Sequence, residues 1–120
     1  MKLLALLLTL AASPLAASAA SPDEQTTHLA KDRNCTFCHA FQPARAELGA
    51  VPPAPAFSDI AKRYRGQPGA EDKLVAVVMR GSNPGDRHWA GKVSATQMPP
   101  NPARISEQDA RQLIRWILRP

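Results

Sequence analysis

The stretch Cys35-Thr36-Phe37-Cys38-His39 constrains this chain more than any other part of the sequence. Two cysteines at this spacing, followed at once by a histidine, are the attachment signature of a c-type haem. Each thiol can form a thioether with one haem vinyl group, and the imidazole can then reach the iron. The chain has two cysteines in total, so the motif uses both. We therefore predict one covalent haem c, with Cys35 and Cys38 as attachment points and His39 as an axial iron ligand.

Three other roles for a cysteine pair stay open as alternatives. A disulfide would close a strained two-residue loop and would leave the adjacent histidine without a role. A thioredoxin-like redox pair needs a βαβ context, and no strand-rich pattern follows Cys38. A zinc site needs further ligands at a regular spacing, and the chain has no third cysteine. A covalent haem accounts for both thiols and the histidine.

The N-terminal residues have the composition of an export signal. Lys2 precedes an apolar run from Leu3 to Leu10, and small residues follow at 17–20. This order matches the charged, apolar and cleavage regions of a secretory signal peptide. The alternative is a membrane anchor, for which the apolar run is short. We predict a cleaved signal peptide at 1–20, an exported domain at 21–120 and no membrane span in the mature chain.

The composition of the domain favours a small fold built around a cofactor. The chain has three Phe, two Trp and one Tyr, a lean supply for an independent core. A covalent haem is itself a large apolar body and would supply what the side chains lack. The net charge is +5, but the basic residues lack the dense stripe typical of nucleic-acid binding. They form either a solvated surface or a field that steers an acidic redox partner.

Apolar spacing and capping residues predict four helices and no strands. The expected helices span 21–33, 57–64, 70–80 and 106–118. Long loops at 41–55 and 81–101, rich in proline, glycine and asparagine, connect them. The expected apolar faces are Leu74, Val77, Val78 and Met79 in the third helix, and Ala110, Leu113, Ile114 and Ile117 in the last. The fold class is all-α, with loops long enough to wrap a haem on both faces.

The second axial ligand decides the chemistry of the iron. Met98 is followed by Pro99 and Pro100, which stiffen the backbone and can hold a thioether at the iron at little entropic cost. A methionine opposite a histidine fills both axial positions and raises the reduction potential. The other possible ligands are His88, Met79 and His28. We predict Met98, with His88 as its main rival.

These residues together resemble the class I cytochromes c, specifically the small bacterial monohaem proteins that carry electrons in the periplasm. The resemblance runs in order through essentially the whole mature chain. Its motifs are C-x-x-C-H-A at 35–40, P-A-F at 55–57, G-A-E-x-x-L at 69–74, G-S at 81–82, M-P-P-N at 98–101 and W-I-L at 116–118. It implies the cytochrome c fold, in which about four short helices and long loops wrap around one covalent haem.

The resemblance also implies roles for residues around the haem. Pro55 matches the proline whose backbone carbonyl accepts the imidazole N–H of the proximal histidine. Asn101 matches an asparagine that hydrogen-bonds near the methionine sulfur. Trp89 and Arg80 resemble positions that reach the haem propionates.

The expected function is transfer of single electrons between periplasmic redox proteins, without bond chemistry and therefore without enzyme activity. The partners would dock briefly at an exposed haem edge, with the chain acting as a monomer or as a subunit of a transient complex. One alternative is the haem subunit of an oxidoreductase complex. Another is an open-site haem protein that binds peroxide or a diatomic gas, which would require an iron without Met98.

Overall fold

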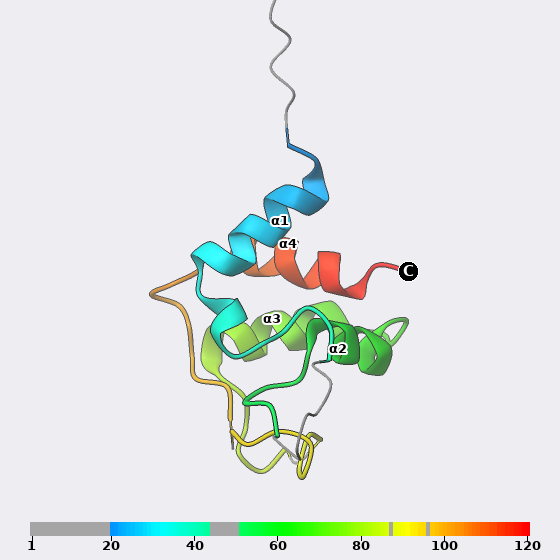
Figure 1. Ribbon diagram of the computed structural model, residues 1–120, viewed down its shortest axis with the longest axis vertical. Helices are drawn as coiled ribbons and strands as arrows, with labels where there is room; N and C mark the ends of the chain where they lie inside the picture. The colour runs from blue at the N-terminus through cyan, green and yellow to red at the C-terminus, as the bar shows by residue number, and fades with distance from the viewer. Residues whose placement is uncertain (1–19, 44–50, 87, 96) are drawn as a thin grey trace, which may run out of the picture.

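The computed structural model describes residues 20–43, 51–86, 88–95 and 97–120. These residues form four α-helices and one short 3-10 helix, and no strand (Figure 1). The elements are α1 (Pro22–Asp32), η1 (Cys35–Phe37), α2 (Phe57–Tyr64), α3 (Ala70–Arg80) and α4 (Glu107–Leu118). The predicted all-α fold is confirmed, and each predicted helix agrees with the observed one to within a residue at either end. The short helix η1 was not predicted.

Serine side chains cap the first and last helices. The Ser21 Oγ accepts a hydrogen bond from the N–H of Glu24 at 3.2 Å, and the Ser106 Oγ accepts one from the N–H of Asp109 at 3.0 Å. Such caps satisfy N–H groups that lack a partner inside the helix. Acidic residues in both first turns interact favourably with the positive end of the helix dipole. Local sequence therefore determines where these two helices begin.

The last helix, α4, is the centre of the fold and packs against α1, α2 and α3 (Figure 1). Its buried residues are Ala110, Leu113, Ile114 and Ile117, which confirms the predicted face. The core also includes Ala30 from α1, together with Phe57, Ala61 and Tyr64 from α2. Because α4 contacts three other helices, it buries a wide apolar stripe, as the spacing of its own four buried residues indicates.

The buried face of α3 differs at one position from the prediction. Val75 is buried together with Leu74 and Val78, whereas Val77 is half-buried. The predicted placement of Val77 on the buried face was wrong because the arc that faces the core is centred nearer to Val75. Met79 is also half-buried and packs against the edge of the core.

An arginine cluster ties α4 to α3 on the outside of the core. Arg111 Nη1 donates to Glu71 at 2.9 Å and to Asp72 at 2.7 Å, while its Nη2 donates to Glu107 at 3.2 Å. Arg115 Nε donates to the same Glu71 oxygen at 3.0 Å. The hydrogen bonds from Arg115 and Arg111 lower the pKa of the Glu71 carboxyl. This carboxylate therefore stays ionised to a lower pH than an unpaired one.

The long loops gather at the end of the molecule away from α1 (Figure 1). Two backbone hydrogen bonds join them: the N–H of Ser94 donates to the carbonyl of Pro52 at 2.8 Å, and the N–H of Ala95 to that of Pro53 at 3.2 Å. The loop before α2 and the loop before α4 are thus joined although they are distant in sequence. Together they form one wall of the site described below.

The predicted signal peptide at 1–20 lies, apart from Ala20, outside the described residues, so it stays a prediction. The first described helix begins directly after it, at Pro22. Within the described part of the chain, no helix is both long enough and apolar enough to cross a membrane.

Candidate functional site

The C-x-x-C-H motif forms a tight turn directly after α1. Asn34 has a left-handed conformation (φ 59°), which separates α1 from η1. Asparagine tolerates this conformation better than most residues other than glycine. The N–H of His39 then donates to the carbonyl of Cys35 at 3.0 Å, so the chain turns through the whole motif. Both cysteines are free thiols, with Cys35 half-buried and Cys38 exposed.

The structure argues against a redox pair or a zinc site at the two cysteines. Burial raises the pKa of the Cys35 thiol, whereas reactive redox cysteines have a lowered one. The described residues contain no strand that could complete a βαβ unit. Among the same residues, no group of three or more His, Cys, Asp or Glu side chains is placed to hold a metal ion. A covalent haem is the interpretation that uses both thiols and the histidine beside them.

His39 is 9% exposed, and two neighbours fix its ring. Its Nδ1 lies 2.7 Å from the carbonyl oxygen of Pro55. Because a carbonyl only accepts hydrogen bonds, Nδ1 carries the proton and Nε2 keeps a free lone pair. The Phe57 ring stacks on the imidazole, with centres 5.4 Å apart and planes at 11°. Burial lowers the pKa of His39 despite the opposing effect of the Pro55 hydrogen bond, so the imidazole stays neutral and able to bind a metal.

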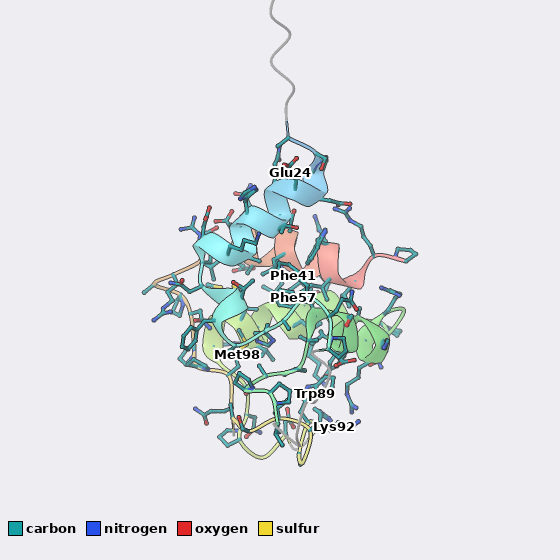
Figure 2. The ribbon with its side chains drawn as sticks, in the orientation of Figure 1. Glu24, Phe41, Phe57, Trp89, Lys92 and Met98 are labelled. Atoms are coloured by element: carbon teal, nitrogen blue, oxygen red, sulfur yellow. The ribbon has the colours of Figure 1, made fainter. Side chains whose placement is uncertain are left out.

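Phe57 connects the His39 ring to the helical core. It makes edge-to-face contacts with Phe41 (5.6 Å, 69°) and with Trp116 of α4 (6.2 Å, 84°). Phe41 and Trp116 also contact each other at 6.0 Å. Figure 2 shows Phe41 and Phe57 close together in the middle of the molecule. The orientation of the imidazole therefore depends on α4, far away in sequence.

Met98 lies in a loop, but backbone contacts hold it in place. Its N–H donates to the Ser82 Oγ at 2.8 Å, and its carbonyl accepts from the N–H of Ser82 at 3.0 Å. Gly81 approaches so closely that a Cβ added there would lie 2.9 Å from the Met98 oxygen. The backbone of Gly81 has φ +83°, a conformation that glycine adopts without strain. The side chain of Met98 is half-buried and packs against the core.

Asn101 fastens the segment after Met98 to α3. Its N–H donates to the carbonyl of Val78 at 3.1 Å, and its Nδ2 lies 3.5 Å from the same oxygen. The Nδ2 also donates to the carbonyl of Pro99 at 2.6 Å. The resemblance implied a hydrogen bond near the methionine sulfur, whereas these contacts are with backbone carbonyls. In the structure Asn101 therefore holds the loop that carries Met98.

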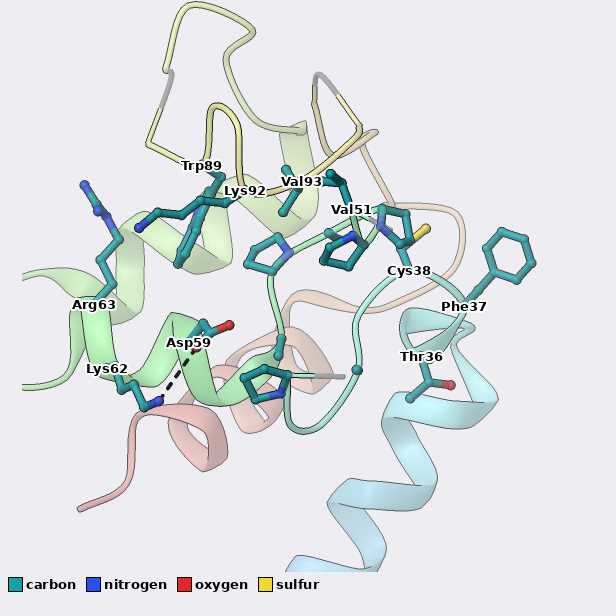
Figure 3. A pocket seen from close by; sticks show the side chains of 17 residues that line it. Thr36, Phe37, Cys38, Val51, Asp59, Lys62, Arg63, Trp89, Lys92 and Val93 are labelled. Atoms are coloured by element: carbon teal, nitrogen blue, oxygen red, sulfur yellow. Dashed lines mark ion pairs between the residues drawn. The ribbon is translucent and has the colours of Figure 1, made fainter. Parts of the chain in front are cut away.

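A cavity of about 940 Å³ opens beside the motif (Figure 3). Cys38, Pro55 and Trp89 line it, as does Ala40, which directly follows His39. The wall also contains Val51, Val93, Pro43, Pro52 and Pro53. Its size lies within the roughly 300–1,000 Å³ typical of ligand and cofactor sites. The wall is largely apolar and includes the free thiol of Cys38, whereas Cys35 and His39 are not among the lining residues.

Some of the predicted residues lie outside the wall of this cavity. Met98 and Asn101 are held next to α3 instead, and neither is among the lining residues. Arg80 is exposed at the end of α3 and lines a second, smaller cavity together with Arg111 of α4. The predicted contact of Arg80 with a haem propionate stays a prediction.

The rival axial ligands have different surroundings. Met79 is half-buried against the core and lines the same second cavity as Arg80. His28 is exposed on α1. His88 is also exposed, and its Nδ1 lies 3.0 Å from Nη2 of Arg63. The surroundings of Met79, His28 and His88 thus give no indication that any of the three ligates iron.

Arg63 is a cavity residue that the sequence analysis did not single out. It lies on α2, and its guanidinium carbon is 5.6 Å from the centre of the Trp89 ring. In the sequence it is one of several basic residues on the polar side of a short helix. Its partner His88 is 25 positions away, so no local pattern could reveal the contact.

The sequence matches the cytochrome c family over residues 25–119. This match extends from the first helix to the end of the last one. It includes every residue predicted to attach, ligate or contact the haem.

Individual relatives agree with the family match. The chain is 40% identical over 90 residues to cytochrome c-551 of Allochromatium vinosum, which covers 75% of this chain and 80% of that protein. It is 32% identical over 118 residues to cytochrome c-551 of Pseudomonas aeruginosa, which covers 98% and 97%. The crystal structure of Nitrosomonas europaea cytochrome c552 superposes with a TM-score of 0.57 at 33% identity, over 77% of this chain and 95% of that one. The chain therefore belongs to the cytochrome c family, as a small class I member with one covalently bound haem c.

Proposed function

We propose that this protein is a periplasmic carrier of single electrons, in which Cys35 and Cys38 attach the haem while His39 and Met98 ligate its iron. The haem iron, when bound, accepts and returns one electron by alternating between its ferric and ferrous states. The observation that carries the proposal is the 2.7 Å contact between Nδ1 of His39 and the carbonyl of Pro55. This hydrogen bond selects the tautomer and fixes the ring, so that a buried, neutral Nε2 is available to a metal.

The contacts of Met98 support its role as the second ligand. The paired hydrogen bonds with Ser82 hold its backbone, and the prolines that follow it limit the motion of the loop. Two ligands on a constrained backbone change little in position when the oxidation state changes. A site with both axial positions filled suits electron transfer and leaves no position for a substrate, so we expect no enzyme activity.

The proposed location follows from the leader at 1–20, which would export the haem domain at 21–120. Its partners would be other periplasmic redox proteins that dock at the mouth of the cavity. Phe37 (87% exposed) and Val51 (48% exposed) offer apolar surface there. The protein would act as a monomer or as a subunit of a transient complex, and we expect no nucleic-acid partner.

Visible spectroscopy of the purified haem protein tests the proposed ligands. We expect low-spin spectra in both oxidation states and, in the oxidised protein, the weak band near the red end that marks iron–sulfur ligation. Met98→Ala should abolish this band, and the matched variant His88→Ala should keep it. High-spin features in the unmodified protein would favour an open-site haem protein instead. Loss of the low-spin spectrum in His88→Ala would overturn the assignment of Met98.

Two further measurements test attachment and electron transfer. Mass spectrometry of the unfolded protein should find the haem still bound, and Cys35→Ala with Cys38→Ala should release it. Stopped-flow mixing with candidate periplasmic redox proteins should give rapid oxidation and reduction. Stable co-purification with a larger catalytic chain would favour the oxidoreductase subunit over the free carrier.

A further inference from the structure

The end of α3 leaves backbone groups that the helix itself does not pair. Gly81 ends the helix: its N–H donates to the carbonyl of Val77 at 2.8 Å, and its φ of +83° turns the chain away from the helical path. In a continued helix the N–H of Ser82 would donate to the carbonyl of Val78. Here Ser82 donates elsewhere, so the carbonyl of Val78 needs a donor from another part of the chain.

The segment 98–101 supplies the missing partners. The carbonyl of Met98 accepts the N–H of Ser82 at 3.0 Å, and the N–H of Asn101 donates to the carbonyl of Val78 at 3.1 Å. The segment therefore caps α3, although it lies 16 to 23 positions later in the chain. Met98 is labelled near this end of the helix in Figure 2. The backbone of Met98 and the end of α3 are thus held together as one unit.

One donor of this unit is paired by a side chain. The N–H of Met98 donates to the Ser82 Oγ at 2.8 Å, in a half-buried position. Ser82 therefore makes two hydrogen bonds with the same residue, one through its backbone and one through its hydroxyl. Among the described residues, it is the one side chain that hydrogen-bonds to the Met98 backbone. Bonds to both the N–H and the carbonyl fix the orientation of this backbone as well as its position.

We infer that Ser82 is a positioning residue for the iron–sulfur bond, because its hydroxyl fixes the Met98 backbone at the end of α3. The inference rests on the function proposed above, in which the Met98 sulfur ligates the iron. A thioether on a fixed backbone loses little further freedom when it binds, so ligation costs less entropy. Without the hydroxyl, the unligated loop gains freedom, and Met98 becomes easier to displace.

Neighbouring residues hold the loop at other points. The Asn101 side chain contacts the carbonyls of Val78 and Pro99, so it acts on the segment that follows the ligand. Gly81 packs closely against the Met98 oxygen but has no side chain with which to bind it. The Ser82 hydroxyl acts on the N–H of Met98 itself. Its removal should therefore affect the ligand most directly.

Displacement of Met98 by imidazole tests the inference in the full haem protein. Imidazole is a small base that binds ferric haem iron, and the iron–sulfur band disappears as the thioether is displaced. Ser82→Ala removes the hydroxyl, and Ser82→Thr keeps it. Ser58→Ala is the matched control, because the half-buried hydroxyl of Ser58 has no hydrogen-bond partner among the described residues. Each variant is titrated with imidazole, and its free energy of unfolding is measured in urea.

We expect Ser82→Ala to bind imidazole about 2–12 times more tightly than the unmodified protein, the factor that corresponds to one hydrogen bond of typical strength. Ser82→Thr and Ser58→Ala should keep the affinity of the unmodified protein. Equal affinities in Ser82→Ala and Ser58→Ala would overturn the inference, as would a Ser82→Ala variant that changes only the free energy of unfolding. A threonine variant that behaves like Ser82→Ala would also overturn it, because the hydroxyl would then not be the cause.

Amide hydrogen exchange in the unmodified protein gives a check that needs no substitution. The N–H of Met98 should exchange with solvent much more slowly than that of Gln97, its exposed neighbour. Similar exchange rates would show that the hydroxyl does not hold Met98 and would overturn the inference. Absence of the iron–sulfur band from the unmodified protein would instead refute the proposed function.

Discussion

Replacing Phe57 with alanine should lower the free energy of unfolding of the haem protein by about 3–5 kcal/mol, the usual cost of removing a buried aromatic side chain. Phe57 is 5% exposed, so its removal leaves a cavity among the rings of His39, Phe41 and Trp116. The edge-to-face contacts with Phe41 and Trp116 contribute about 0.5–1.5 kcal/mol each, or about 1–3 kcal/mol together. Phe57→Leu keeps most of the apolar volume and should therefore cost only about 1–3 kcal/mol.

Unfolding in guanidinium chloride, followed by helical circular dichroism and by haem absorption, measures these changes. The matched control is Phe37→Ala, the same substitution at a residue that is 87% exposed. We expect it to change the free energy of unfolding by no more than about 0.5 kcal/mol. A cost below about 1 kcal/mol for Phe57→Ala, or equal costs at the two positions, would refute the argument that this aromatic cluster holds the His39 ring.

Three further predictions use the same unfolding assay. Gly81→Ala should destabilise the protein more than Gly66→Ala. Both residues have a positive φ, but only at Gly81 would the new Cβ meet another atom, the Met98 carbonyl oxygen at 2.9 Å. Equal losses of unfolding free energy in the two variants would contradict this prediction. Asn101→Ala should cost about 0.5–1.5 kcal/mol through its lost side-chain hydrogen bonds and should weaken the iron–sulfur band, and an unchanged band would show that the loop is held without it. Because the pKa of Glu71 is lowered in the folded protein, its ionised form stabilises the fold at any pH above the ordinary pKa range of a carboxyl group. This contribution is lost as the pH falls through the lowered pKa. Glu71→Gln should therefore flatten the acid side of the stability profile, and an unchanged acid side would contradict the assignment.

The helices were predictable because their determinants are local. Ser21 and Ser106 cap helices whose buried residues recur at helical spacing, and both signals lie within a few positions of the structure they specify. The error at Val77 has a different origin. Periodicity finds an apolar stripe, but the helix that packs against it determines the centre of the buried arc, and here that helix is α4.

The sequence alone predicts the attachment chemistry, the family and the all-α fold class. It does so because thiol spacing, helix capping and apolar periodicity are properties of residues that are close together in the chain. The tertiary structure decided how the site is supported. It brings Pro55 and Phe57 to His39, Ser82 to Met98, and Trp89 and His88 to Arg63. These pairs join segments that are far apart in sequence, and they are made only in the folded chain. Contacts of this kind depend on the whole fold, which is why the neighbours of His39, Met98 and Arg63 could be identified only from the structure.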